Sequence, residues 1–170
     1  MDTEYRRDAI LEKLCISSKP LTGTVLAREF SVSRQIIVSD IAILRAKGSN
    51  IYATSQGYLI PTAGDKNLEI TIACQHGSEE LEKELVIFVE EGAQVIDVIV
   101  EHPIYGEIKA NLMLNNLFDV RNFVKKRNET QAEPLSMITG GVHLHTLLIQ
   151  SEEQLQRIKN KLRNCNLLAE

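Results

Sequence analysis

The segment Gly140-Gly141-Val142-His143-Leu144-His145-Thr146-Leu147-Leu148-Ile149-Gln150 is the stretch around which the second half of this chain is organised. After two flexible glycines it continues as an apolar run with the composition of a buried β-strand. Because side chains alternate across a strand, His143 and His145 are expected on one face, with Cα atoms about 6.5 Å apart. Two ordinary core histidines are the alternative, but a same-face pair favours a shared ligand, most often a divalent metal. We therefore expect this strand to form one wall of a metal or ligand site.

The composition is that of an ordinary globular protein. The chain has 170 residues, of which 44% are hydrophobic and 25% charged, enough for one large domain or two small ones. No apolar run approaches the ~20 residues of a membrane helix, and residues 1–17 are too charged for a signal peptide, so a cytoplasmic protein is expected. Cys15, Cys74 and Cys165 lack a paired spacing and are predicted to be reduced core residues. Of the three cysteines, only Cys74 stands out, because it lies two residues before His76.

Charge is distributed unevenly along the chain. Residues 1–60 contain eight Lys and Arg against six Asp and Glu, whereas residues 61–170 contain 11 against 17. A mildly basic N-terminal part on an acidic C-terminal part fits a protein whose N-terminal part approaches phosphate groups.

Three short helices and a hairpin are expected in the first 60 residues. Apolar residues at helical spacing predict helices over residues 5–16, around 22–30 with Thr22 or Thr24 as the cap, and from Ser33 to Gly48. Residues 51–53 and 58–60 alternate like the two strands of a small β-hairpin.

This order resembles the winged helix-turn-helix of bacterial regulators, and residues 26–35 and 40–45 match the usual pattern of that module. Ser31 stands where the turn between the helices usually has glycine, and Ser39 where a basic residue is common. In such modules the third helix enters the major groove with its N-terminal residues on base edges. The expected DNA contacts are Ser33, Arg34, Gln35, Val38 and Ser39. A helical module that contacts only proteins is the alternative.

The rest of the chain is predicted to be one α+β domain. Pro and Gly between residues 61 and 65 indicate a boundary, with domains over 1–62 and 66–170. Period-two and helical patterns then follow in the order β-α-β-β-α-β-α, which predicts a two-layer sandwich with helices on one sheet face. Ser78 is expected to cap the first of these helices. Glu82 and Glu84 border the buried stripe of this helix on opposite sides, and the helical wheel does not choose between them.

The histidines suggest a metal centre. His76 follows the first strand of this domain, so it can join His143 and His145 if the two strands are neighbours. One carboxylate from the following helix would complete a set of three imidazoles and an oxygen. Such donors suit zinc, nickel, cobalt or iron rather than calcium or magnesium.

The whole chain, from about Arg6 to Leu162, resembles the niacin-responsive transcriptional repressors of NAD biosynthesis, which join a winged helix-turn-helix to a three-histidine domain. The resemblance is carried by the N-terminal segments above, by His76 with Glu84 eight residues on, by residues 102–106 (His-Pro-Ile-Tyr-Gly) and by residues 140–145. It implies a regulatory domain similar in fold to the histidine-containing phosphocarrier. It also implies that one divalent metal, with nickel and zinc the first candidates, is bound by His76, Glu84, His143 and His145.

The implied function is a non-enzymatic, homodimeric repressor that binds operator DNA with nicotinic acid as co-repressor. His102 and Tyr105 are the expected effector-binding residues. The alternatives are that His102, which precedes a proline, stabilises its loop and that Tyr105 is a packing residue. Two alternatives are a metal-dependent hydrolase with Glu84 as general base, and a regulator for which the metal itself is the signal.

Overall fold

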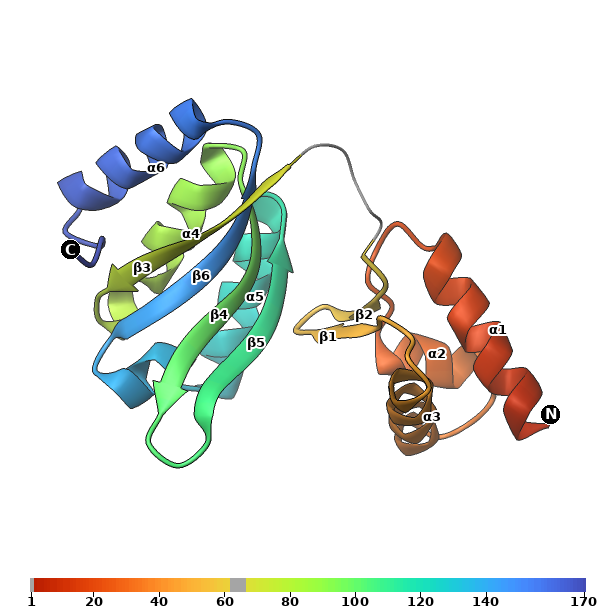
Figure 1. Cartoon of the computed structure of the whole chain (residues 1–170). Helices are drawn as coiled ribbons and strands as arrows, with labels where there is room; N and C mark the ends of the chain where they lie inside the picture. Colours follow the sequence, from red (N-terminus) through yellow and green to blue (C-terminus); the bar gives the residue numbers. More distant parts are fainter. Residues whose placement is uncertain (1, 62–66) are drawn as a thin grey trace. The chain divides into compact units, whose positions relative to one another are not determined.

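The computed structural model describes residues 2–61 and 67–170, and the chain divides into two compact units, Met1–Ala63 and Gly64–Glu170 (Figure 1). The boundary predicted at residues 61–65 falls almost entirely on residues 62–66, which lie outside the described residues. Each unit has its own cluster of buried apolar side chains. Within the described residues, no helix has the length and apolar character needed to cross a membrane.

The N-terminal unit has three helices followed by a hairpin, as predicted. The elements are α1 (Thr3–Ile16), α2 (Gly23–Glu29), α3 (Arg34–Ala46), β1 (Tyr52–Thr54) and β2 (Gly57–Leu59). Thr22, rather than Thr24, caps α2 by accepting the backbone N–H of Val25 at 3.1 Å. Ser33 caps α3 in the same way, accepting the N–H of Ile36 at 3.2 Å. Both hydroxyls satisfy backbone donors that a helix leaves free at its first turn.

The turn between α2 and α3 depends on Ser31. This residue has a φ of 53°, in the left-handed region that normally favours glycine. The backbone N–H of Val32 still donates to the carbonyl of Ala27 at 3.0 Å, so the turn closes with a side chain present. The departure from the family pattern at this position therefore leaves the helix-turn-helix intact.

A buried ion cluster fixes α3 against α1. Asp40 on α3 is 2% exposed and accepts Nε of Arg6 at 2.7 Å and Nε of Arg7 at 3.0 Å. Burial by itself would raise the pKa of Asp40, but the two guanidinium groups outweigh burial and hold this pKa below its usual value. The inner face of α3 is completed by the buried residues Ile37, Ile41 and Leu44.

The C-terminal unit has the predicted order β-α-β-β-α-β-α. Its elements are β3 (Leu68–Gln75), α4 (Leu81–Glu90), β4 (Gln94–His102), β5 (Gly106–Leu114), α5 (Leu117–Thr130), β6 (Val142–Ile149) and α6 (Glu152–Asn164). The strands form one antiparallel sheet in the order β3-β6-β4-β5, and the three helices lie on the same side of it (Figure 1). The predicted α+β class is confirmed.

The start of α4 differs from the prediction. Ser78 does not cap this helix, because residues Ser78–Glu80 form a short 3-10 turn and α4 begins at Leu81 without a side-chain cap. The hydroxyl of Ser78 is instead directed at the carboxylate of Glu79, at 3.4 Å. A second 3-10 turn, Leu135–Thr139, leads into Gly140 and β6.

We expect Asp40→Ala to lower the free energy of unfolding of the N-terminal unit by about 3–5 kcal/mol, because it leaves the buried guanidinium of Arg6 without its partner. Urea unfolding at neutral pH, followed by circular dichroism, measures this loss. The control is Asp8→Ala, which removes an exposed carboxylate from α1 and should change the stability by no more than about 0.5 kcal/mol. Equal effects of the two substitutions would contradict the structural role of Asp40.

Candidate functional site

Three histidines meet at one end of the sheet because β3 and β6 are neighbours. In the register of this strand pair, Cys74 faces His143 and Ile72 faces His145, while His76 follows directly after β3. The rings of His76 and His145 each lie edge-on to the ring of His143, with centroids 4.9 Å apart. The same-face arrangement expected for His143 and His145 is present.

The acid at the centre of this group is Glu84. Its side chain comes from α4 and is fully buried. Oε2 of Glu84 lies 2.9 Å from Nε2 of His76 and 3.4 Å from Nε2 of His145, and Oε1 lies 3.0 Å from Nε2 of His143. Glu82, which the helical wheel could not separate from Glu84, is exposed.

Each of the three rings is anchored through its other nitrogen. The Nδ1 atoms of His76, His143 and His145 lie 2.8, 2.9 and 2.7 Å from the backbone carbonyl oxygens of Gly77, Gly141 and Asp97, respectively. Because a carbonyl oxygen only accepts, each Nδ1 carries a proton, so Nε2 of each ring faces Glu84 with its lone pair when the ring is neutral and as a donor when the ring is protonated. Lone pairs and a carboxylate that face one another repel unless a proton or a cation lies among them.

The pKa shifts in this group reflect the attraction between the Glu84 carboxylate and protonated histidines. Burial would raise the pKa of Glu84, but the charge of His145 and the hydrogen bonds from the histidines outweigh it and hold the pKa well below its usual value. Burial would lower the pKa of His76 and of His145, yet Glu84 raises both above the usual value. The centre therefore attracts positive charge.

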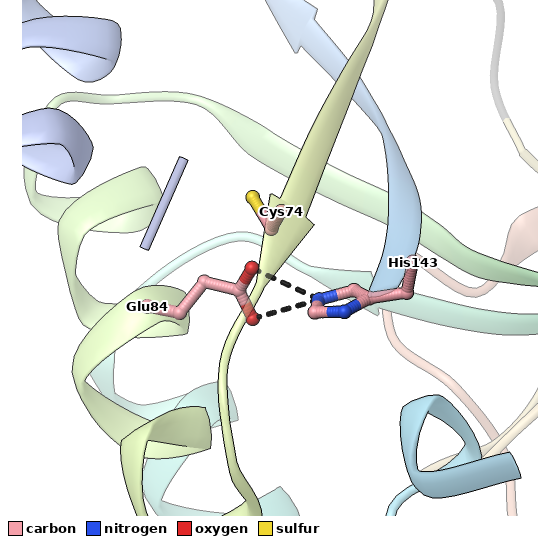
Figure 2. A group of neighbouring side chains, drawn as sticks. All are labelled: Cys74, Glu84 and His143. Atoms are coloured by element: carbon pink, nitrogen blue, oxygen red, sulfur yellow. Dashed lines mark hydrogen bonds and ion pairs between the residues drawn. The ribbon is translucent and has the colours of Figure 1, made fainter. Parts of the chain in front are cut away.

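These donors fit a transition-metal ion. Imidazole nitrogen and carboxylate oxygen are ligands that zinc, nickel and iron accept. Nε2 of His76 is also a buried nitrogen that is 2.9 Å from Glu84 but is not aligned for a hydrogen bond, and it has no hydrogen-bond partner in the described residues. Cys74 adds sulfur to the group, since its Sγ and the donor atoms of Glu84 and His143 all lie within 4.8 Å of one another (Figure 2).

Gly141 holds the two strands together at this centre. A β-carbon on Gly141 would lie 2.3 Å from the carbonyl oxygen of His76, and the φ of Gly141 is +94°. Its own carbonyl accepts the backbone N–H of His76 at 3.3 Å and Nδ1 of His143 at 2.9 Å. From the sequence, Gly140 and Gly141 are equivalent flexible residues, because nothing in the sequence reports how closely another backbone approaches.

Asp97 is a second residue of the centre that no sequence motif indicates. Its backbone carbonyl accepts Nδ1 of His145, and its carboxylate accepts the backbone N–H of Thr146 at 3.1 Å. The ladders of β4 with both of its neighbours shift register between Val95 and Asp97. A β-bulge of this kind changes the direction of the groups beside it. No sequence motif predicts this bulge.

His102 and Tyr105 lie at the turn between β4 and β5. Nδ1 of His102 accepts the backbone N–H groups of Ile104 at 3.1 Å and Tyr105 at 3.3 Å, and the two rings lie 4.9 Å apart. Because β4 runs antiparallel to β6, this turn is at the same end of the sheet as the start of β6. No described contact joins either side chain to the three-histidine group. The two hydrogen bonds that His102 accepts from the backbone stabilise this turn.

The residues expected to contact DNA lie at the N-terminal end of α3. Ser33, Arg34, Gln35 and Ser39 are exposed, and Val38 is half-buried. The inner face of the same helix carries the buried residues described above, so this group forms the outer surface of its first turns. The hydroxyl of Ser33 is already engaged as the helix cap.

Comparison with known proteins identifies the family. Residues 69–170 match the model of the 3H domain, and residues 6–59 match that of an HTH domain. The transcription repressor NadR of Bacillus subtilis is 44% identical over 166 residues, covering 96% of this chain and 92% of that protein. The probable transcription repressor NiaR of Thermotoga maritima is 41% identical over 167 residues, covering 98% and 95%.

This chain belongs to the family of 3H-domain transcription repressors. The family identified from the sequence is thus confirmed, together with an N-terminal helix-turn-helix that binds DNA. Both relatives match along nearly their whole length and are named as transcription repressors. Repressors are not enzymes, so the hydrolase alternative is set aside.

We expect Gly141→Ala to disrupt the centre without removing any of its donor groups. The β-carbon must push the His76 backbone away, and the positive φ adds a strain of about 1–2 kcal/mol, so the free energy of unfolding should fall by more than 2 kcal/mol. The control is Gly140→Ala, because Gly140 also has a positive φ of +64° but nothing within 4 Å of its added β-carbon. Urea unfolding of both variants makes the comparison, and equal losses would show that the close contact with His76 is unimportant.

Proposed function

We propose that this chain is a repressor of genes for NAD biosynthesis or niacin uptake, with nicotinic acid as co-repressor, sensed at a divalent-metal centre in residues 66–170. The observation that carries the proposal is the convergence of three Nε2 atoms on one buried carboxylate. The membership in a family of transcription repressors supports the regulatory role. Such a regulator meets its operator in the cytoplasm.

In this proposal His76, Glu84, His143 and His145 hold one divalent transition metal, with nickel and zinc as the first candidates. When bound, the ion supplies a concentrated positive charge with affinity for the carboxylate or the pyridine nitrogen of nicotinate. The three backbone carbonyls that hold Nδ1 keep the rings aimed, so the centre is preorganised. His102 and Tyr105, at the same end of the sheet, are proposed to contact the effector.

Residues 1–62 are proposed to bind the operator through the outer surface of α3. The proposed contacts are Ser33, Arg34, Gln35, Val38 and Ser39. A single winged helix reads few bases, so we propose a homodimer that reads two half-sites, with residues 66–170 as the dimerising part. Nicotinate and operator must then strengthen each other's binding by the same factor.

We expect Arg34→Ala to weaken operator binding by about 1–3 kcal/mol, which is roughly 5- to 150-fold in the dissociation constant, because a guanidinium can bind guanine through two hydrogen bonds. The matched control is Arg45→Ala, which removes the same charge from the last turn of α3. Fluorescence anisotropy with labelled operator, at one fixed salt concentration, gives both constants. Similar losses in the two variants would leave only a general charge effect.

We expect His143→Ala to bind metal at least about 100-fold more weakly, since even partners of metal ligands contribute 10- to 100-fold, and to lose the response of operator binding to nicotinate. His102→Ala is the control: it should retain the metal and weaken only the nicotinate response. Metal analysis and operator titrations with and without nicotinate measure both effects. Full metal occupancy in His143→Ala would overturn the ligand set, and a metal-dependent affinity that nicotinate leaves unchanged would favour a pure metal sensor.

A further inference from the structure

Cys74 lies at the wall of the three-histidine centre. It is fully buried, and its backbone is held on both sides, since it faces His143 across the strand pair and forms a bridge with Leu168 near the C-terminus. Figure 2 shows its side chain beside the carboxylate of Glu84, which is bonded to His143. Cys74 and His76 are two residues apart and so belong to the same face of β3 and its extension. The sulfur therefore has a fixed place at the centre.

The distances allow one ion to reach this sulfur. Two ligands of one zinc ion are never farther apart than the sum of their bond lengths, which is about 4.4 Å for sulfur and imidazole nitrogen. The Sγ of Cys74 and the donor atoms of Glu84 and His143 lie within 4.8 Å of one another. At a tetrahedral angle the sulfur and nitrogen donors of one zinc ion lie about 3.6 Å apart, so side-chain movements of up to about 1 Å bring all three within reach of one ion.

Nε2 of His76 lies 2.9 Å from Glu84 without an aligned hydrogen bond, as expected of a nitrogen whose lone pair is directed at a cation. The His76 side chain is 3% exposed, and its Nε2 has no hydrogen-bond partner in the described part of the chain, although Glu84 is close. Buried polar atoms are normally paired. This orphan atom is independent of Cys74 and is directed at the same carboxylate.

The charge balance favours a second anionic ligand. A divalent ion held by three neutral imidazoles and Glu84 leaves one positive charge among side chains that are at most 3% exposed, which is costly in a buried site. Two other carboxylates act on the histidines, but Glu80 is paired with Lys83 at 3.3 Å and Asp97 with Lys109 at 3.4 Å. The thiolate of Cys74 would make the centre neutral.

We infer that Cys74 is a sulfur ligand of the proposed metal centre, together with the three histidines and Glu84. This inference rests on the proposed metal site. The thiol proton leaves to solvent as the sulfur bonds to the ion. A sulfur ligand shifts the preference of the centre further toward zinc, cobalt, nickel and ferrous iron, and away from manganese and magnesium.

Cobalt(II) tests the inference, because a cobalt–thiolate bond gives an intense near-ultraviolet charge-transfer band that nitrogen and oxygen ligands do not give. The parent protein is the full chain with Cys15→Ser and Cys165→Ser, which leaves Cys74 as its single thiol. Titration of this parent with Co²⁺ should produce both the visible d–d bands and the charge-transfer band. Adding Cys74→Ser should abolish the charge-transfer band and weaken cobalt binding at least about 10-fold, with circular dichroism as the check on folding.

The outcomes separate this inference from the proposal on which it rests. Visible d–d bands in the parent without the charge-transfer band would overturn the role of Cys74 and leave the histidine and glutamate site standing. Absence of any cobalt spectrum in the parent would overturn both. Because the parent spectrum alone distinguishes these results, the test does not depend on whether the Cys74→Ser variant folds. His143→Ala in the same parent should reduce all the bands together.

Discussion

The C-terminal unit is built around a buried carboxylate that faces three imidazole nitrogens. Each imidazole is held by a hydrogen bond from Nδ1 to a backbone carbonyl, so no ring can turn its Nε2 away from Glu84. The negative charge of Glu84 has to be balanced by positive charge. Without a metal ion, protons on the histidines supply it, and the pKa values of His76 and His145 are therefore raised. Protons and metal ions compete for the same nitrogen atoms.

The fold brings these groups together from distant parts of the sequence. The pairing of β3 with β6 places His76 beside His143, the close approach at Gly141 locks that pair, and α4 delivers Glu84 from the helical layer. The centre therefore exists only in the folded unit. Any ligand that binds there stabilises this unit by mass action, since the unfolded chain offers no comparable site.

The two units use buried charge in different ways. In the N-terminal unit, Asp40 has permanent cationic partners in Arg6 and Arg7, and this closed cluster holds α3 at a constant position against α1. In the C-terminal unit, the partner of Glu84 is exchangeable, because imidazole accepts either a proton or a metal ion. A helix held at a fixed position and a centre with variable occupancy are the two components that the proposed ligand-responsive repressor requires.

Hydrophobic periodicity and helix caps were sufficient to predict the helix-turn-helix, the order of the C-terminal elements and the shared face of His143 and His145, because these depend on local patterns of 2 and 3.6 residues. The same reasoning placed His76 and an acid near that pair but could not separate Glu84 from Glu82. Only the packing of α4 on the sheet buries Glu84 and leaves Glu82 exposed. The tertiary structure alone also decided the contact at Gly141, the bulge at Asp97 and the place of Cys74, since each depends on how closely separate strands approach in space.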